Sequence, residues 1–336
     1  MRFDEPSGAW MFVGVHSTVL GPAMGGTRLK AYPAPTDALT DVLRLSGAMT
    51  LKQAAAALPY GGGKAVLAVP SVPAPGSPER EALLRRYADI VDALGGTYVT
   101  AADMNTGQAD MDVVGERTTH VLGRSRERGG SGDPAPSTAV GVFHGIVASL
   151  AHAFGSHAVE GRTVLVQGVG AVGGRLAELL TDAGAAVLVS DVDPVRAQAK
   201  AEQIGARVIA PDRVVGTVCD VYAPCATGGV LDAAAIPALR CRVVAGAANN
   251  QLATAEDAAR LRDADILYAP DYVINAGGVI HLAGHETLGW DEAAVAARLA
   301  GIGRTLADVF AEADGSGITT AEAADRLARA RLDGET

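Results

Sequence analysis

Residues 163–191 read TVLVQGVGAVGGRLAELLTDAGAAVLVSD, and this stretch decides the fold of the second half of the chain. The apolar run TVLVQ is typical of a buried strand, and helical spacing of apolar residues begins at about Val172. Between them, three glycines permit a tight turn, close approach of the backbone to a pyrophosphate, and close helix–strand packing. The start of the helix also offers free N–H groups to phosphate oxygens. The pattern predicts a dinucleotide-binding turn formed by Gly168, Gly170, Ala171, Val172 and Gly173.

The residue that ends the next strand points to the identity of the dinucleotide. The run AAVLVS ends at Asp191, where a carboxylate can accept hydrogen bonds from both hydroxyls of a ribose. A carboxylate there repels the 2′-phosphate of NADP, so the sequence favours NAD. Asp193 is an alternative ribose ligand, because a sequence locates the end of a strand only to within a few residues. An ordinary glycine-rich turn between a strand and a helix is the alternative to the whole motif.

Strand and helix patterns alternate along the rest of the chain. Beyond Asp191, the short apolar runs CDVYAP, RVVAGAA and ILYAPDYVIN are separated by helical stretches, which is typical of a parallel, doubly wound sheet. In the first half, we expect a helix from Thr36, as its N-cap, to about Leu58. The strand KAVLAVP, a helix over residues 79–94 and the strand TYVTAAD follow.

The expected fold is α/β with two domains. The loop RSRERGGSGDPAP, residues 124–136, is rich in Gly, Pro and charge and predicts a hinge. We therefore expect a substrate-binding and catalytic domain over residues 1–133 and a Rossmann-type domain over residues 134–299. The C-terminal helices, from about residue 300 to 336, are expected to pack back on the first domain.

Composition excludes several classes of function. The chain has 336 residues, of which 49% are hydrophobic, and a formal net charge of −10 without a basic arm, so we expect no nucleic-acid partner. No apolar run approaches the length of a membrane span, and MRFDEPSGAW is not typical of a signal peptide. Three cysteines, Cys219, Cys225 and Cys241, lack metal-ligand spacing. We expect reduced cysteines, no metal, no membrane partner and a cytoplasmic location.

Three charged residues of the first half are candidates for catalysis. Lys52 lies in the apolar helical stretch AMTLKQAAAAL, where a lysine most often extends to solvent. Lys64 follows three glycines, which allow a backbone to approach a ligand, and a lysine fixed in such a place can act as a base near neutral pH. Asp103 stands at the junction of a strand and a loop, where catalytic carboxylates often lie.

Five longer motifs carry a resemblance to a known family. GPAMGGTR (21–28), LKQAAAALPYGGGKAV (51–66), TAADMNT (100–106), VAGAANNQL (244–252) and APDYVINAGGVI (269–280) resemble the glutamate/leucine/phenylalanine/valine dehydrogenases. The resemblance extends from about Val13 to about Arg331. The stretches GRSRERGG, NAGGVIHL and LGW are most similar to phenylalanine dehydrogenases. The family implies a first domain with a mixed sheet that also supports oligomer formation.

The resemblance implies a role for each matched residue. Lys64 is similar to the catalytic lysine that activates water, Asp103 to the carboxylate that handles protons on the nitrogen, and Lys52 to the lysine that binds the substrate carboxylate. Gly25 and Gly26 would assist Lys52, and Asn249 would orient the substrate and the nicotinamide. The cofactor would also be contacted by Thr138, Ala223, Pro224, Ala248, Asn250 and Asn275. Two close lysines would depress each other's pKa, which favours a neutral base.

The same resemblance bears on the substrate side chain. The glutamate-specific branch has a lysine where this chain has Met24, so an acidic side chain would lie unpaired there. The matched pocket positions are all apolar: Met24, Ala101, Val279 and Leu282. Phenylalanine, or a broad aromatic and aliphatic range including leucine, valine and isoleucine, is expected. His144 is expected to be structural, and His281 is a candidate for tuning specificity.

The expected reaction is therefore NAD-dependent, reversible oxidative deamination of a hydrophobic L-amino acid to its 2-oxo acid and ammonia. A 2-hydroxy-acid dehydrogenase and a non-catalytic NAD-binding regulator are the alternatives. The first would need a catalytic histidine–carboxylate pair, and the second could dispense with Lys64. Relative to the family pattern, the chain begins late, in a region that often supports subunit contacts. A homo-oligomer is still expected.

Overall fold

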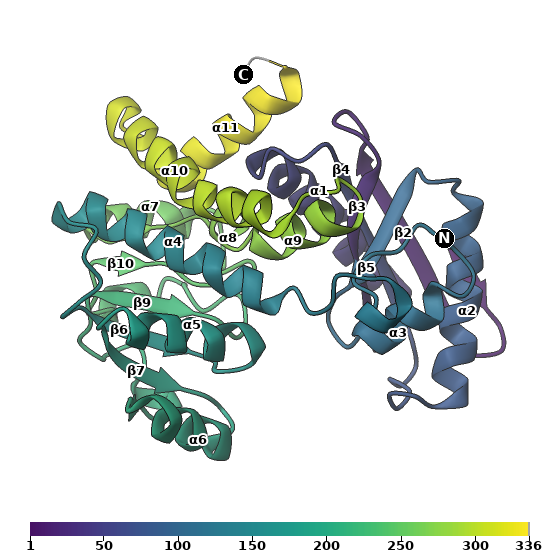
Figure 1. The fold of residues 1–336 in the computed structure, drawn as a ribbon, viewed down its shortest axis with the longest axis horizontal. Coiled ribbons are helices and arrows are strands. Elements are labelled where there is room, and N and C mark those ends of the chain that lie inside the picture. Colours follow the sequence, from purple (N-terminus) through teal and green to yellow (C-terminus); the bar gives the residue numbers. More distant parts are fainter. Residues whose placement is uncertain (335–336) are drawn as a thin grey trace. The chain divides into compact units, whose positions relative to one another are not determined.

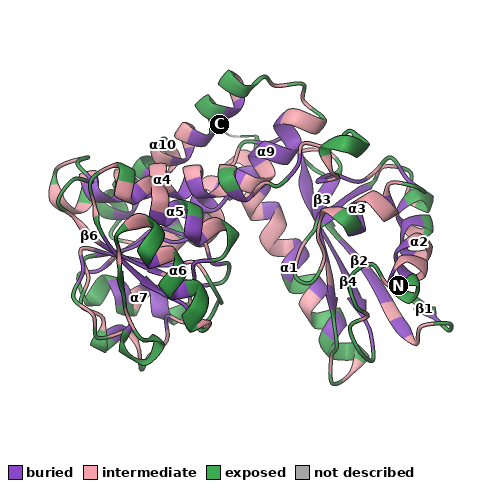
Figure 2. Cartoon of the chain, turned by 60° about the horizontal axis from the view of Figure 1, so that its bottom comes forward, coloured by how far each residue is buried: buried purple, intermediate pink, exposed green. Residues whose placement is uncertain are grey.

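The computed structural model describes residues 1–334, which form two compact units (Figure 1). The first unit contains residues 1–134 and 281–291 together with the C-terminal residues from Ala328 onward. The second unit contains residues 135–280 and 292–327. Figure 2 shows that in each unit buried strands are covered by helices whose outer faces are exposed. Each unit therefore has its own core.

The sheet of the first unit is mixed. Its strands are β1 (Arg2–Asp4), β2 (Ala9–Ser17), β3 (Ala23–Lys30), β4 (Gly61–Ala68) and β5 (Tyr98–Ala102), in the order β1-β2-β4-β3-β5. Strand β3 pairs in parallel with both β4 and β5, whereas β2 is antiparallel to β1 and β4. The mixed sheet implied by the family resemblance is confirmed.

Helices cover both faces of this sheet. Helix α1 (Pro35–Ala55) packs on one face, where Val42 joins Phe12 and Val66. Helices α2 (Pro78–Ala93) and α3 (Gln108–Val114) cover the other face. Their buried residues, Leu83, Leu84, Tyr87, Val91, Met111 and Val114, form one core with Leu29 and Leu67. Because side chains alternate across a strand, residues 64, 66 and 68 of β4 all point to the α1 side.

The second unit has a parallel sheet. Its strands are β6 (Thr163–Gln167), β7 (Ala186–Ser190), β8 (Arg207–Val208), β9 (Val221–Pro224), β10 (Val243–Val244) and β11 (Leu267–Tyr268), in the order β11-β10-β9-β6-β7-β8. All the described pairs in it are parallel. The order reverses between β6 and β9, as in doubly wound nucleotide-binding sheets. The expected Rossmann-type architecture is confirmed.

The helices from residue 135 onward are α4 (Ala135–Phe154), α5 (Ala171–Asp182), α6 (Pro194–Ile204), α7 (Glu256–Asp263), α8 (Asp271–Ile274), α9 (Gly277–Glu286), α10 (Glu292–Ser316) and α11 (Thr320–Asp333).

Helix α4 is long and apolar enough to span a membrane by length and composition, which corrects the expectation that no run approaches that length. Its fully buried residues Val142, Ile146 and Leu150 lie in the core of the second unit, as in a core helix of a folded domain.

Two expected boundaries differ from the structure. Helix α10 stays in the second unit instead of returning to the first, because its Ile302 and Leu306 fill the space left by Gly141 and Gly145 of α4. Conversely, residues 281–291 join the first unit. There, Glu286 accepts hydrogen bonds from the backbone N–H of Gly123, at 3.0 Å, and of Ser131, at 2.9 Å, and so holds the predicted hinge loop.

The expected N-cap of α1 is wrong. The cap is Ala34, whose N–H donates to the Asp37 carboxylate at 3.1 Å, and Thr36 lies in the first turn. Pro35 explains the shift, because its fixed φ suits the first helical position.

Candidate active site

Lys64 and Asp103 form an ion pair in the first unit. Lys64 Nζ lies 2.9 Å from Asp103 Oδ1, and the lysine side chain is only 6% exposed. Lys64 comes from the middle of β4 and Asp103 from the residue after β5, with β3 lying between these strands. A Cβ at Gly26 of β3 would lie 2.8 Å from the Cβ of Asp103. Glycine at position 26 therefore makes room for a carboxylate that reaches toward Lys64.

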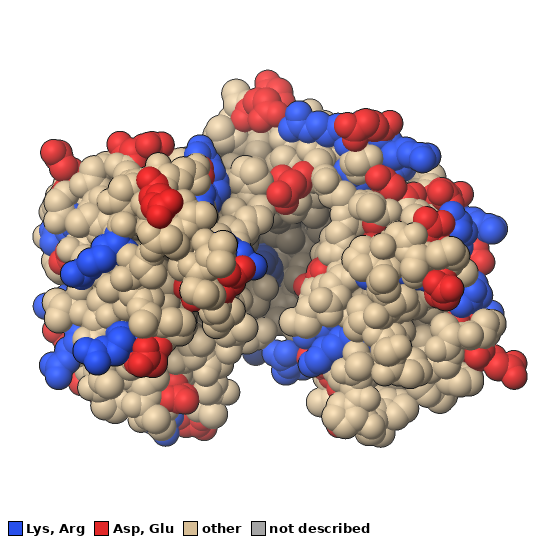
Figure 3. Space-filling view, turned by 90° about the horizontal axis from the view of Figure 1, so that it is seen from below, with Lys and Arg blue, Asp and Glu red and all other residues tan. Residues whose placement is uncertain are grey.

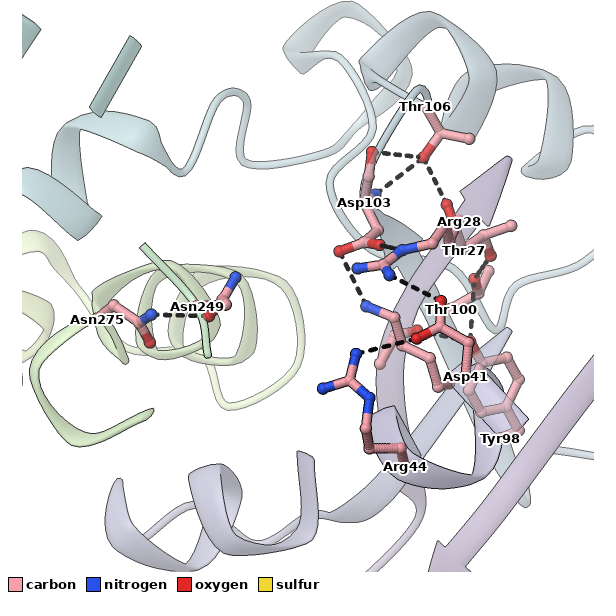
Figure 4. A network of polar contacts seen from close by, with 12 residues as sticks. Thr27, Arg28, Asp41, Arg44, Tyr98, Thr100, Asp103, Thr106, Asn249 and Asn275 are labelled. Atoms are coloured by element: carbon pink, nitrogen blue, oxygen red, sulfur yellow. Dashed lines mark hydrogen bonds and ion pairs between the residues drawn. The ribbon is translucent and has the colours of Figure 1, made fainter. Parts of the chain in front are cut away.

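A second cation completes this cluster (Figure 4). Arg28, two residues beyond Gly26 on the same face of β3, donates from Nε to Asp103 Oδ2 at 3.0 Å. Its Nη1 donates to Asp41 of α1 at 2.8 Å. Asp41 also accepts from the Tyr32 hydroxyl, at 2.6 Å, and from Arg44, at 2.9 Å. Arg28 thus links the Asp103 carboxylate to helix α1.

The charges of this cluster act on the pKa values of its members. Burial lowers the pKa of Lys64, and the charge of Arg28 lowers it further, while the charge of Asp103 opposes both effects. Burial raises the pKa of Asp103, but the charges of Lys64 and Arg28 outweigh it and bring this pKa to about 2. Asp103 is therefore ionised at neutral pH, and Lys64 loses its proton more readily than an ordinary lysine. The charge of Arg28, which the sequence reading did not single out, thus contributes to the lowered pKa of Lys64.

The glycines before Lys64 have a different role from the one expected. Gly61, Gly62 and Gly63 lie inside β4, not in a loop before it. A Cβ at Gly62 would lie 2.1 Å from Thr50 Oγ1 of α1, and one at Gly63 would lie 2.7 Å from the ring of Tyr98. These glycines let α1 and Tyr98 pack closely on the strand. They position Lys64 by close packing of the protein against itself.

The remaining first-half candidates lie in the same unit. Lys52 is half-buried in the last turn of α1, the helix that packs on the Lys64 side of the sheet. Gly25 and Gly26 lie in β3, and the Gly25 carbonyl accepts from the Tyr98 hydroxyl at 2.6 Å. The pocket candidates Met24, Ala101 and Leu282 are buried in the first unit, whereas Val279 is half-buried in the second.

The three glycines of the dinucleotide motif take the three expected positions in the second unit. Gly168 has φ +91°, which favours glycine in the turn after β6. A Cβ at Gly173 would lie 1.9 Å from the Gly168 carbonyl oxygen, so only glycine lets α5 pack against the turn. A Cβ at Gly170, the N-cap of α5, would meet no protein atom within 4 Å. Open space therefore lies at the helix start, where a phosphate would bind next to Ala171 and Val172.

Asp191 follows β7 directly, as expected. Its carboxylate accepts from the N–H of Val169 in the glycine turn and from the N–H of Asp193, both at 2.9 Å. Asp193 instead caps α6, where its carboxylate accepts from the N–H of Val195 at 3.0 Å. Arg196, which is half exposed, lies 3.3 Å from Asp191 and 3.4 Å from Asp193. The sequence did not single out this arginine.

The other predicted cofactor contacts lie at the same edge of the sheet, since they follow the carboxyl ends of its parallel strands. Ala223 and Pro224 end β9, and Ala248 donates its N–H to the Pro224 carbonyl at 2.9 Å. Asn275 Nδ2 donates to Asn249 Oδ1 at 2.7 Å (Figure 4). The next residue, Asn250, has φ +52°. The buried Gln251 donates to the carbonyls of Gly246 and Ala248. Thr138 lies in the first turn of α4, half-buried.

Two histidines were weighed from the sequence. His144 is half-buried on α4, and burial lowers its pKa. His281 is buried on α9, with its ring against His285 at 4.8 Å between centroids. The sequence reading missed four residues of the two sites: Arg28, Asp41, Arg196 and Gln251. The available signal for Arg28 was its charge in the strand AMGGTRLK, immediately after Gly-Gly-Thr.

The chain is similar to known proteins over almost its whole length. The family described as Glu/Leu/Phe/Val dehydrogenase, dimerisation domain, matches residues 9–120. The family described as Glutamate/Leucine/Phenylalanine/Valine dehydrogenase matches residues 129–195 and 190–333.

Named relatives give the same result. Leucine dehydrogenase of Geobacillus stearothermophilus is 41% identical, over 98% of this chain and 89% of the relative. Valine dehydrogenase of Streptomyces virginiae is 44% identical, over 98% of this chain and 91% of the relative. The structure of L-tryptophan dehydrogenase from Nostoc punctiforme superposes with a TM-score of 0.83 at 38% identity, over 98% and 94% of the two chains.

Proposed function

Because the chain belongs to the glutamate/leucine/phenylalanine/valine dehydrogenase family, its reaction is the oxidative deamination of a hydrophobic amino acid, and we propose that it uses NAD and that Lys64 is the base. The observation that carries the proposal is the buried contact of Lys64 with Asp103 at 2.9 Å. It places a lysine with a lowered pKa beside a carboxylate that is ionised at neutral pH. A histidine–carboxylate pair, as the 2-hydroxy-acid alternative needs, is not part of this cluster of described residues.

The second unit fits a dinucleotide. The open space at Gly170 and the N-terminus of α5 suit a pyrophosphate, and the carboxylate of Asp191 suits a ribose. The Asp191 carboxylate accepts two backbone hydrogen bonds, and the half-exposed Arg196 contacts both of its oxygens, at 3.3 and 3.4 Å. Ribose hydroxyls would take the place of the Arg196 contacts. The negative charge of Asp191 favours NAD over NADP. When bound, NAD supplies the hydride acceptor.

The first unit supplies the groups that act on the amino acid. Lys52 would hold the substrate carboxylate and so fix Cα for loss of hydride. After this loss, the substrate carries an iminium carbon, and neutral Lys64 would take a proton from the water that attacks this carbon. Asp103, in contact with Lys64, would relay this proton from Lys64 to the nitrogen that leaves as ammonia. The carbonyl of the 2-oxo acid then forms as the C–N bond breaks and the hydroxyl gives its proton to Lys64, which is neutral again.

The substrate side chain is proposed to be branched and aliphatic, as in leucine and valine. The relatives at 41% and 44% identity are named leucine and valine dehydrogenases, and Met24, Ala101, Val279 and Leu282 are all apolar. The similarity of short stretches to phenylalanine dehydrogenases keeps phenylalanine as the second candidate. One methylene in such a pocket is worth only about 1–3 kcal/mol, so activity toward neighbouring substrates is expected.

Assembly and location are further proposals. A homo-oligomer is supported by the match of residues 9–120 to a dimerisation domain and by exposed apolar residues of the first unit such as Phe3 and Leu43. A cytoplasmic location is supported by three free cysteines. On the face drawn in Figure 3, acidic and basic side chains are interspersed, in keeping with a small-molecule substrate in place of nucleic acid.

One assay tests the function. Each protein L-amino acid, and the hydroxy analogues of leucine and phenylalanine, is offered with NAD or with NADP, and reduction of the nicotinamide is followed by its absorbance. Leucine and valine with NAD are expected to give the highest kcat/KM, and the hydroxy acids no turnover. Turnover of the hydroxy acids alone would contradict the proposed reaction. Binding of NAD without turnover of any compound would favour the non-catalytic regulator.

A further inference from the structure

Asp103 is carried by a tight turn, residues 103–107, whose conformation depends on hydrogen bonds. The Asp103 N–H donates to Thr106 Oγ1, and this hydroxyl donates to the Thr27 carbonyl, both at 2.8 Å. At its tip, Asn105 has φ +61°, in the left-handed region that asparagine enters more readily than most residues, and its Nδ2 donates to the Leu29 carbonyl at 3.0 Å. These contacts hold the turn on the side of β3.

Arg80 of α2 holds this turn from behind. The residue is 4% exposed, and its Nη2 donates to the Asn105 carbonyl at 2.5 Å. Its Nε and Nη2 also donate to the two carboxylate oxygens of Asp110, at 2.6 and 2.7 Å. Asp110 in turn accepts from the N–H of Gly107 at 2.8 Å. The Arg80–Asp110 pair thus contacts the tip and the end of the turn whose first residue is Asp103.

A buried ion pair is weak evidence for a gain in stability, because desolvation offsets the attraction between the charges. Helix α2 offers an internal comparison. Arg86 makes the same bidentate contact with Asp4, at 2.7 Å for both bonds, but this pair ties β1 to the helix and touches neither Asp103 nor its turn. The two pairs share the bidentate geometry and the helix, and they differ in the exposure of the arginine, 4% for Arg80 and 29% for Arg86, and in what they hold.

We propose that Arg80 is a positioning residue for the reaction: by gripping Asn105 and Asp110, it fixes the 103–107 turn so that the Asp103 carboxylate stays in contact with Lys64. The inference rests on the proposed role of Asp103. A planar guanidinium is required, because it reaches the Asp110 carboxylate and the Asn105 carbonyl at once, whereas a single ammonium cannot present that fork.

The test is a double-mutant cycle with Arg80→Lys, Asp103→Asn and both together. Arg80→Lys is expected to lower kcat about tenfold to a hundredfold, with the KM for NAD within about twofold, because a small displacement of a catalytic group costs rate. In the Asp103→Asn background, Arg80→Lys is expected to cause no further loss of kcat, since it acts through Asp103. Losses of kcat that multiply in the double variant would overturn the inference.

Arg86→Lys is the matched control. It is expected to lower the melting temperature less than Arg80→Lys, because Arg86 is more exposed, and to leave kcat unchanged. If Arg80→Lys does not fold, Asp110→Asn replaces it in the same cycle. If Arg80→Lys has the kcat of the wild type and Asp103→Asn is impaired, the inference about Arg80 is overturned and the proposed function of Asp103 is not affected. Full activity of Asp103→Asn would overturn the proposed function of Asp103 and the inference with it.

Discussion

The guanidinium of Arg28 lies 3.0 Å from Asp103, the same carboxylate that contacts Lys64. The carboxylate therefore lies between two cations, one fixed in charge and one that titrates. Arg28 and Asp103 act on the lysine in opposite directions: the charge of Arg28 lowers the pKa of Lys64 and the charge of Asp103 raises it. Asp41, on α1, also raises it. The pH dependence of the enzyme is the direct readout of this arrangement.

Two substitutions should move the pH profile in opposite directions. Arg28→Gln removes a positive charge beside Lys64, so the lysine pKa rises and the rising limb of kcat/KM for deamination moves to higher pH. Asp103→Asn removes the negative charge, so the same limb of the residual activity moves to lower pH. The measurement is kcat/KM for leucine across about pH 7 to 11. A shift of both variants in one direction would contradict the charge arrangement.

The glycines of the dinucleotide turn should separate binding from stability. Gly170→Ala is expected to keep the wild-type melting temperature and to weaken NADH binding at least about tenfold, because its Cβ meets no protein atom but enters the space proposed for phosphate. Gly173→Ala is expected to lower stability by about 1–3 kcal/mol, because its Cβ would lie 1.9 Å from the Gly168 carbonyl oxygen. Thermal unfolding measures the stability of each variant, and NADH fluorescence titration measures its cofactor binding. Equal effects of the two variants on stability would argue against these assignments.

Asp191 should determine the choice between NAD and NADP. Asp191→Asn removes the charge that repels a 2′-phosphate and leaves Arg196, 3.3 Å away, available to pair with it. The ratio of kcat/KM for NADP to that for NAD is expected to rise at least about tenfold. Asp193→Asn is the matched control and should leave this ratio unchanged. A rise with Asp193→Asn alone would transfer the ribose role to Asp193.

Lys52 should bind the substrate without affecting the cofactor. Lys52→Gln is expected to raise the KM for leucine and for its 2-oxo acid at least about tenfold, because the charge that pairs with the substrate carboxylate is lost. The dissociation constant of NADH should remain within about twofold of the wild type. Steady-state kinetics in both directions and fluorescence titration test this. An unchanged KM for both acids would remove Lys52 from the substrate site.

The sequence predicted structure and site residues correctly where the residue type itself restricts the local conformation or chemistry. The glycine spacing of 168–173 fixed a strand, a turn and a helix, and all three glycines take the expected positions. Lys64 and Asp103 were also found, since a lysine directly after three glycines and a carboxylate at the junction of a strand and a loop are conspicuous. Their direct contact was not found, because it depends on the strand order, which places β3 and its Gly26 between them.

Long-range packing explains what the sequence did not predict. Arg28 pairs with Asp41 and Asp103 from three separate elements, and no local pattern shows that they meet. Residues 281–291 join the first unit through Glu286, whose hydrogen-bond partners lie far away in the chain. Similarly, α10 remains in the second unit because Ile302 and Leu306 fit opposite glycines of α4. In each case tertiary contacts decide the outcome.

The central claim, that Lys64 is the base, is tested most directly by the turnover of Lys64→Ala with leucine and NAD, with Lys30→Ala, an exposed lysine at the end of β3, as the control. We predict that kcat of Lys64→Ala falls at least about a hundredfold, while its NADH binding remains that of the wild type. For Lys30→Ala, the melting temperature and kcat are expected to remain those of the wild type. A Lys64→Ala enzyme that folds, binds NADH and turns over leucine within about threefold of the wild-type rate would contradict the account.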